Sequence, residues 1–180
     1  MITRWACFAL LALLPAAGYG QNGAHDGRRD FDFEIGAWQA TVSRLQRPLS
    51  GSKEWVDYRG TSVVRKVWDG DANLGELDVA GPAGRIRGLS LRTYNPQARE
   101  WHIHWANSRD GEVGPPMVGG FSNGRGEFYG REFLDGRAIY VRFVFSEMQA
   151  NSFQIEQAFS VDGGRSWEPN WIAKFTRDGS

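Results

Sequence analysis

Beyond residue 30, apolar and polar side chains alternate with a period of two, and turn-forming residues interrupt the pattern about every ten residues. Successive side chains of a strand point to opposite faces, so this alternation is typical of strands with one buried face. The 3.6-residue period of an amphipathic helix is nearly absent. The pattern predicts about ten strands, at residues 38–44, 55–68, 74–79, 85–94, 101–107, 116–121, 126–134, 138–147, 153–161 and 167–177.

Short connections join these predicted strands. Asn95-Pro96 and Asp135-Gly136 are strong turn signals, and the second is typical of a tight hairpin. A run of hairpins forms a meander, which at this length closes into a barrel or splits into a sandwich. Closure leaves no exposed sheet edge. We therefore expect an all-β fold, an antiparallel up-and-down β-barrel of about eight to ten strands.

The N-terminus has the pattern of a secretory signal peptide. Arg4 supplies a positive charge, residues 5–14 are apolar, and small residues follow. The apolar run is about half of the roughly 20 residues that span a bilayer, which favours cleavage over a retained anchor. We expect a signal peptide at 1–20, a flexible lead-in at 21–30 and a single barrel domain at 31–178. The mature chain would then be periplasmic or secreted and would have no membrane span.

Charge and cysteine content exclude several functions. The 21 Lys and Arg residues balance 21 Asp and Glu residues, whereas nucleic acids are bound through an excess of basic side chains. The single cysteine, Cys7, lies within the predicted signal peptide, so the mature chain has no disulfide and no thiolate chemistry. Phosphate-loop, dinucleotide-binding and zinc-protease motifs are absent from the sequence. We expect no nucleic-acid partner, no cofactor and no metal site.

Several motifs resemble known barrel proteins. Gly36-Ala37-Trp38 resembles the Gly-x-Trp opening of lipocalins, in which the Trp closes the barrel floor beneath a basic side chain from late in the chain. That resemblance implies such a role for Lys174 or Arg177. Longer segments resemble a family of secreted bacterial lipocalin-like proteins of unknown function: 31–38, 92–96, and 156–164 with Trp171. That resemblance implies a calycin-type barrel, and it offers no catalytic residues to carry over.

A second, local resemblance lies before the last predicted strand. Residues 160–167 fit the Asp-box pattern Ser-x-Asp-x-Gly-x-x-Trp, which recurs in sialidase propellers. A propeller would need several copies, and this chain has one. We expect a structural turn, in which Asp162 accepts backbone N–H groups, the glycines adopt positive φ and Trp167 packs over the loop. Near the start of the domain, residues 32–35 are expected to form a short helical turn.

Strand alternation also predicts which side chains face the barrel axis. At 101–107, Trp101, Ile103 and Trp105 share one face, while His102 and His104 share the other. Turning the apolar faces inward creates an aromatic lumen that either binds a small apolar or amphipathic molecule or is filled as a solid core. The candidate ligand-binding residues are Trp105, Met117, Tyr129, Arg131, Phe143, Phe145, Gln157 and Trp171.

Two alternatives to ligand binding remain open at the level of sequence. Glu156 and Arg142 fall on the outward face of the assigned strands, but the opposite assignment would bury them as an acid–base pair of an isomerase or cyclase. A packed structural or protein-interaction domain would have a filled lumen. The pair His102 and His104 lacks a third ligand at a suitable spacing, and a metal site is therefore not expected. Binding is favoured over catalysis.

Overall fold

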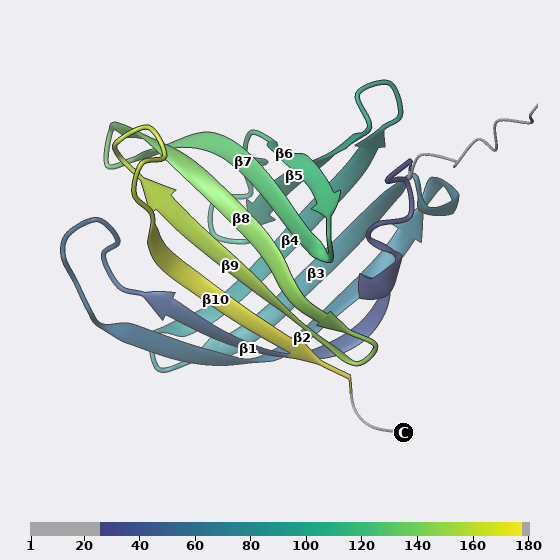
Figure 1. Cartoon of the computed structure of the whole chain (residues 1–180). Coiled ribbons are helices and arrows are strands. Elements are labelled where there is room, and N and C mark those ends of the chain that lie inside the picture. Colours follow the sequence, from purple (N-terminus) through teal and green to yellow (C-terminus); the bar gives the residue numbers. More distant parts are fainter. Residues whose placement is uncertain (1–25, 178–180) are drawn as a thin grey trace, which may run out of the picture.

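Antiparallel pairing between the first and last strands closes the sheet into a ten-stranded barrel (Figure 1). The computed structural model describes residues 26–177, and the expected signal peptide lies outside them, as do residues 21–25 of the expected lead-in. Every strand pairs with its neighbours in sequence, which confirms the predicted up-and-down barrel. The strands are β1 Gly36–Leu45, β2 Trp55–Val67, β3 Ala72–Gly81, β4 Gly84–Asn95, β5 Glu100–Asn107, β6 Met117–Ser122, β7 Arg125–Leu134, β8 Arg137–Gln149, β9 Ser152–Ser160 and β10 Glu168–Thr176.

The predicted inward faces of β5, β8, β9 and β10 are confirmed. Trp101 and Ile103 of β5 are buried within the barrel, and so are Val141 of β8 and Ile155 of β9. The alternation holds because a shift of one residue would expose every one of these side chains to water. Within residues 26–177, no helix is both long enough and apolar enough to cross a membrane.

A short segment before β1 seals one end of the barrel. It contains η1, a 3-10 helix at Asp32–Glu34 that matches the predicted helical turn, and it carries Phe31 and Phe33 into the barrel. The Phe31 ring meets the Trp101 ring edge to face, with centroids 4.9 Å apart. We call the rings gathered here the aromatic plug: Phe31, Phe33, Trp101, Phe121, Phe128, Phe145 and Phe153. The plug makes this the closed end.

Trp38 and Arg177 fasten the plug to the barrel. Trp38 donates a hydrogen bond from Nε1 to the Glu34 carbonyl at 2.7 Å, and the Arg177 guanidinium lies 4.1 Å from the Trp38 ring centroid. This confirms Arg177 as the basic side chain over the tryptophan, whereas Lys174 is exposed on the outside. Gly36 has φ +122°, and a Cβ there would lie 2.9 Å from Arg177 Nη1, so this position requires glycine.

The loop between β9 and β10 forms the predicted turn. Asp162 accepts backbone hydrogen bonds from Arg165 and Ser166 at 3.0 Å each, and Gly163 and Gly164 have positive φ. These hydrogen bonds and those from nearby hydroxyls lower the pKa of the Asp162 carboxyl well below its usual range. Trp167 packs over this loop at the open end of the barrel, which confirms the structural interpretation of the motif.

Candidate ligand-binding cavity

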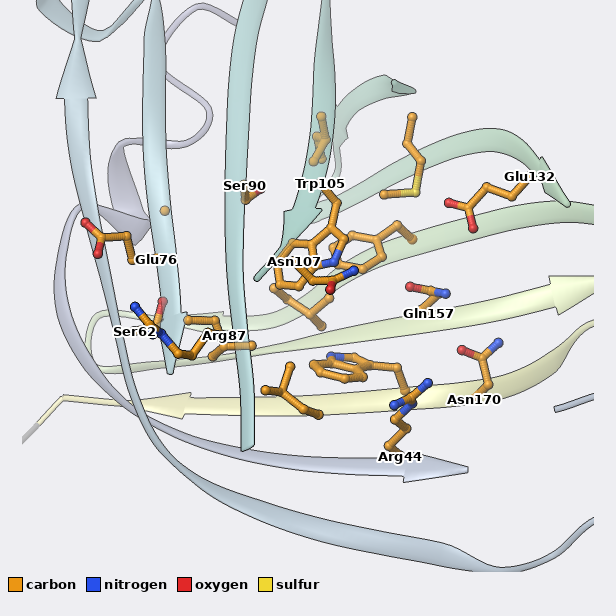
Figure 2. Close-up of a pocket in the computed structure, with 18 of the residues that line it drawn as sticks. Arg44, Ser62, Glu76, Arg87, Ser90, Trp105, Asn107, Glu132, Gln157 and Asn170 are labelled. Carbon is orange, nitrogen blue, oxygen red and sulfur yellow. The ribbon is translucent and has the colours of Figure 1, made fainter. Parts of the chain in front are cut away.

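A cavity of about 480 Å³ occupies the half of the barrel opposite the plug (Figure 2). It opens where β1, β5, β7 and β9 end, because residues near those ends line it. Its size lies within the roughly 300–1,000 Å³ that is usual for small-molecule sites. One half of the lumen is therefore packed with side chains, and the other half is hollow.

Aliphatic and aromatic side chains line the cavity together with a comparable number of polar and charged ones. They come from many strands, because each strand contributes every second residue to the inside of a barrel. Two tryptophans line the cavity, Trp171 from β10 and Trp105 from β5 (Figure 2). The apolar wall consists of Leu77, Ile86, Ile103, Trp105, Met117, Leu134, Phe143, Ile155, Phe159, Trp171 and Phe175.

A buried ion pair lies at the inner end of the cavity, next to the plug. Arg92 donates from Nη2 to Glu34 Oε1 at 3.0 Å and from Nη1 to Asn73 Oδ1 at 3.0 Å. Arg92 Nη1 also lies 2.8 Å from Glu34 Oε2, although no donor among residues 26–177 makes a hydrogen bond to that oxygen. The guanidinium stacks over the Phe31 ring of the plug at 4.9 Å. The N-terminal segment and β4 are thus joined across the lumen.

Burial sets the electrostatics of this pair. Glu34 is 2% exposed, and desolvation raises the pKa of its carboxyl, while the Arg92 charge opposes that rise. Removing a carboxylate and a guanidinium from water is expensive, and the two groups offset each other only while both are present. The pair accordingly marks the deepest polar part of the cavity.

Two serines complete the polar floor. Ser62 of β2 and Ser90 of β4 each line the cavity and are 7% exposed (Figure 2). Among residues 26–177, neither hydroxyl has a hydrogen-bond partner from another side chain. Gly75 of β3 also lines the cavity: it pairs with Ser90 in the sheet, and its Cα lies close to the Arg92 guanidinium, since a Cβ there would be 3.7 Å from Nη1 and Nη2. We use polar floor for Glu34, Ser62, Ser90 and Arg92.

Polar and charged side chains surround the mouth. Gln157 of β9 and Asn170 of β10 project beside the apolar wall, and Glu132 of β7 lies across from Arg44 of β1 (Figure 2). Asn107, also at the mouth, donates a hydrogen bond to Asp110. Polar groups at the mouth and an apolar middle are suited to an amphipathic molecule.

The cavity brings together five of the predicted site residues: Trp105, Met117, Phe143, Gln157 and Trp171. Phe145 faces inward as expected, but it is fully buried in the plug and does not line the cavity. Phe145 therefore lies in the plug and not on the cavity wall, because the N-terminal segment fills the space in front of its ring.

The predicted inward positions of Tyr129 and Arg131 are wrong. Phe128 of β7 is fully buried and points inward. Side chains alternate along a strand, so residues 129 and 131 point outward. Tyr129 is 47% exposed and donates a hydrogen bond to Glu127 at 2.8 Å. The Arg131 guanidinium lies 5.0 Å from the Tyr140 ring centroid. Strict alternation along β7 assigns Glu132, one residue later, to the cavity instead.

Glu156 and Arg142 form an ion pair on the outside of the barrel. Their side chains are 28% and 24% exposed, and the N···O distance is 3.5 Å. Arg142 also lies over the Trp167 ring. The alternative in which they form a buried acid–base pair is wrong, because alternation turns the apolar residues beside them inward.

The two histidines of β5 have separate partners. His102 Nε2 lies 3.1 Å from Glu100, and His104 Nδ1 lies 3.1 Å from the Gly114 carbonyl. Within residues 26–177, no group of three or more His, Cys, Asp or Glu side chains is arranged to hold a metal ion.

The polar floor was not predicted from the sequence. Glu34 and Arg92 are 58 residues apart, and a period-two pattern says nothing of which residues meet across a barrel. One signal was available: Ser62, Ser90 and Arg92 are polar residues at positions whose alternation points inward. Polar residues on an apolar face indicate either a hydrogen-bond network or a ligand.

No protein-family model matches this chain, and no curated protein matches its sequence. Among solved structures, the S-type phycobiliprotein lyase CpeS from Guillardia theta is similar, with a TM-score of 0.58, 11% identity, and coverage of 86% of this chain and 96% of that one. At that identity the similarity shows a shared fold and nothing more.

Two fluorescence-activating barrels are more distant. EF1p2_mFAP2b, solved bound to DFHBI, has a TM-score of 0.47 and 10% identity over 84% of this chain and 99% of that one. A fluorescence-activating β-barrel designed de novo has a TM-score of 0.44 and 13% identity over 83% of this chain and 98% of that one.

Proposed function

We propose that this protein binds a small apolar or amphipathic molecule in the open half of its barrel. The observation that carries the proposal is the cavity of about 480 Å³, which is closed at one end by the aromatic plug and has a mostly apolar surface. A concave cavity with an apolar surface and polar groups that converge on it is the usual form of a small-molecule site.

Burial of the ligand supplies the binding free energy. Each Å² of apolar surface removed from water contributes about 25 cal/mol before the costs of association are subtracted. Gln157 and Asn170 at the mouth, together with the polar floor, orient the molecule. Binding is favoured over catalysis because Glu156 and Arg142, the acid–base pair of the alternative, lie on the outer surface.

We further propose that the protein acts in the periplasm or outside the cell, on the basis of the signal-peptide pattern at residues 1–20. Mass spectrometry of the protein from its native cells tests this. A mature N-terminus near residues 18–23 is expected, and an intact Met1 in the cytosolic fraction would contradict it.

Fluorescence titration tests ligand binding. Trp105 and Trp171 line the cavity, so we expect a saturable change in tryptophan emission with some members of a panel of fatty acids, isoprenoids and aromatic compounds. The variant Ile155→Trp places a large ring inside the cavity and should abolish the response. Gln154→Trp, which adds the same ring to the outward face of the same strand, should keep it.

Thermal unfolding confirms that both variants are folded. The proposal is overturned if no compound in the panel gives a saturable response with the folded wild-type protein, or if Ile155→Trp binds as well as Gln154→Trp.

A further inference from the structure

The inner end of the cavity is polar, although a barrel that held a purely apolar ligand would have an apolar inner end. From this contrast we infer that the polar floor receives an uncharged hydroxyl group of the ligand and disfavours a carboxylate. This inference rests on the proposed function and names the chemical class of the ligand, an alcohol with an apolar body.

Charge is the first argument. Arg92 is the cation of the polar floor, and Glu34 already neutralises it at 2.8 Å. A ligand carboxylate placed beside them would leave a net negative charge in a region where Glu34 is 2% exposed and Arg92 is 5% exposed. An uncompensated charge in such surroundings is strongly unfavourable, whereas a neutral group adds no charge.

Hydrogen-bonding capacity is the second argument. The hydroxyls of Ser62 and Ser90 can each donate and accept, and neither has a side-chain partner in the part of the chain that the structure describes. Within residues 26–177, Arg92 Nε is a buried donor without a partner, and Glu34 Oε2 is a buried oxygen that accepts no hydrogen bond. The floor thus offers both donors and acceptors. A hydroxyl can satisfy both kinds, but a carboxylate can only accept.

The position of the floor supplies the third argument. Above it the wall is apolar on several sides, with Ile103 from β5, Phe143 from β8 and Ile155 from β9. A ligand whose hydroxyl reaches Ser62 or Ser90 therefore places its apolar body against these side chains. The molecule enters with its hydroxyl end leading, and its other end lies near the mouth.

Competition between matched compounds tests the inference. 1-Decanol and decanoate have the same chain length and differ in the head group, and at pH 8 the acid is ionised. Displacement of a fluorescent apolar probe gives the affinity of each. We expect 1-decanol to bind about tenfold more tightly than decanoate, since a neutral head group avoids the cost of an unpaired buried charge.

Two sets of variants locate the effect. The double variant Ser62→Ala with Ser90→Ala should weaken 1-decanol binding about fivefold to tenfold and leave naphthalene binding unchanged. Thr61→Ala, an exposed neighbour of Ser62 on the outer face of β2, is the matched control and should bind like the wild type. Glu34→Gln leaves Arg92 unpaired and should shift the preference toward decanoate.

The outcomes separate the inference from the proposed function. Absence of binding by 1-decanol, decanoate and naphthalene would contradict ligand binding itself. If the wild-type protein binds decanoate as tightly as 1-decanol or more tightly, the inference is overturned and the proposed function stands. The same holds if the serine variants leave 1-decanol binding intact. Should Glu34→Gln fail to fold, the serine variants decide the matter.

Discussion

The two halves of the barrel are built from the same ten strands with the same alternation, yet one is solid and the other hollow. In the closed half, Phe31 and Phe33 enter from a segment outside the sheet and meet rings from the strands. In the open half, several inward positions carry small or polar side chains, such as Ser62, Gly75 and Ser90. Inward alternation therefore creates a lumen, and the side-chain volume at each level decides whether it is filled.

The comparison is tested most strongly by removing one ring from each half. Phe145 is 0% exposed and packs against Phe31 with centroids 5.2 Å apart, so Phe145→Ala should cost about 3–5 kcal/mol of unfolding free energy. Phe143 already borders the cavity, and Phe143→Ala should cost less than half as much. Urea denaturation measures both. Equal losses would mean that the two halves are packed alike.

The ion pair at the border of the two halves gives the next largest effect. Arg92→Met leaves the Glu34 carboxylate buried without its partner and should cost about 3–5 kcal/mol. Glu34→Gln combined with Arg92→Met removes both charges and should recover most of the loss. A double variant as unstable as the single one would show that the charges are not coupled.

The same pair makes stability depend on pH. Burial raises the pKa of the Glu34 carboxyl, so the folded protein retains a proton that the unfolded chain has already released above the ordinary glutamate value of 4.5. The free energy of unfolding should therefore fall as pH rises from that value through the raised one. Denaturation of the wild type and Glu34→Gln across this range tests the sign, and the variant should lack this part of the decline.

Substitution of Arg177, which holds the plug against the barrel, should have an intermediate effect on the free energy of unfolding. Arg177 donates to the carbonyls of Phe33 and Ile35 at 3.1 and 2.8 Å and stacks on Trp38. Arg177→Ala should cost about 1–3 kcal/mol, and Arg177→Lys should recover only part of that, because an ammonium cannot reproduce the planar guanidinium. Urea denaturation measures both variants. A lysine variant as stable as the wild type would mean that charge alone holds the plug.

The outer surface should give the smallest effect. Glu156→Gln breaks a partly exposed ion pair with Arg142 and should change the free energy of unfolding by less than about 1 kcal/mol. Ligand affinity should stay at the wild-type value, because neither side chain lines the cavity. A large loss of affinity in the fluorescence titration would indicate that the outer face takes part in binding.

The strands, their order and most inward residues were predictable because strand periodicity and hairpin turns are local properties of the sequence. Tyr129 and Arg131 were misplaced even though Gly126, Phe128 and Gly130 alternate with them and mark the inward face. The polar floor was beyond local reasoning. Its two charged residues, Glu34 and Arg92, come into contact only when the ten strands close into a barrel. No local sequence pattern specifies which residues will face each other across the lumen.

The volume of the lumen was equally beyond local reasoning. Phe31 and Phe33 precede the first strand and belong to no alternating pattern, so nothing in the strands indicates that they fill one end. A lumen predicted from strand faces alone could be open or filled along its whole length. The structure shows that it is both, at different levels.

The central claim is that a small molecule enters the hollow half and leaves the solid half unchanged. Methyl NMR during titration with 1-decanol or naphthalene tests this most directly, because isoleucine and valine methyls report on separate parts of the fold. Ile103 and Ile155 line the cavity and should shift with a saturable dependence, while Ile172, outside the cavity, and Val64, beside the closed end, should not. Shifts confined to Ile172 or Val64, or no shifts at all, would contradict the account.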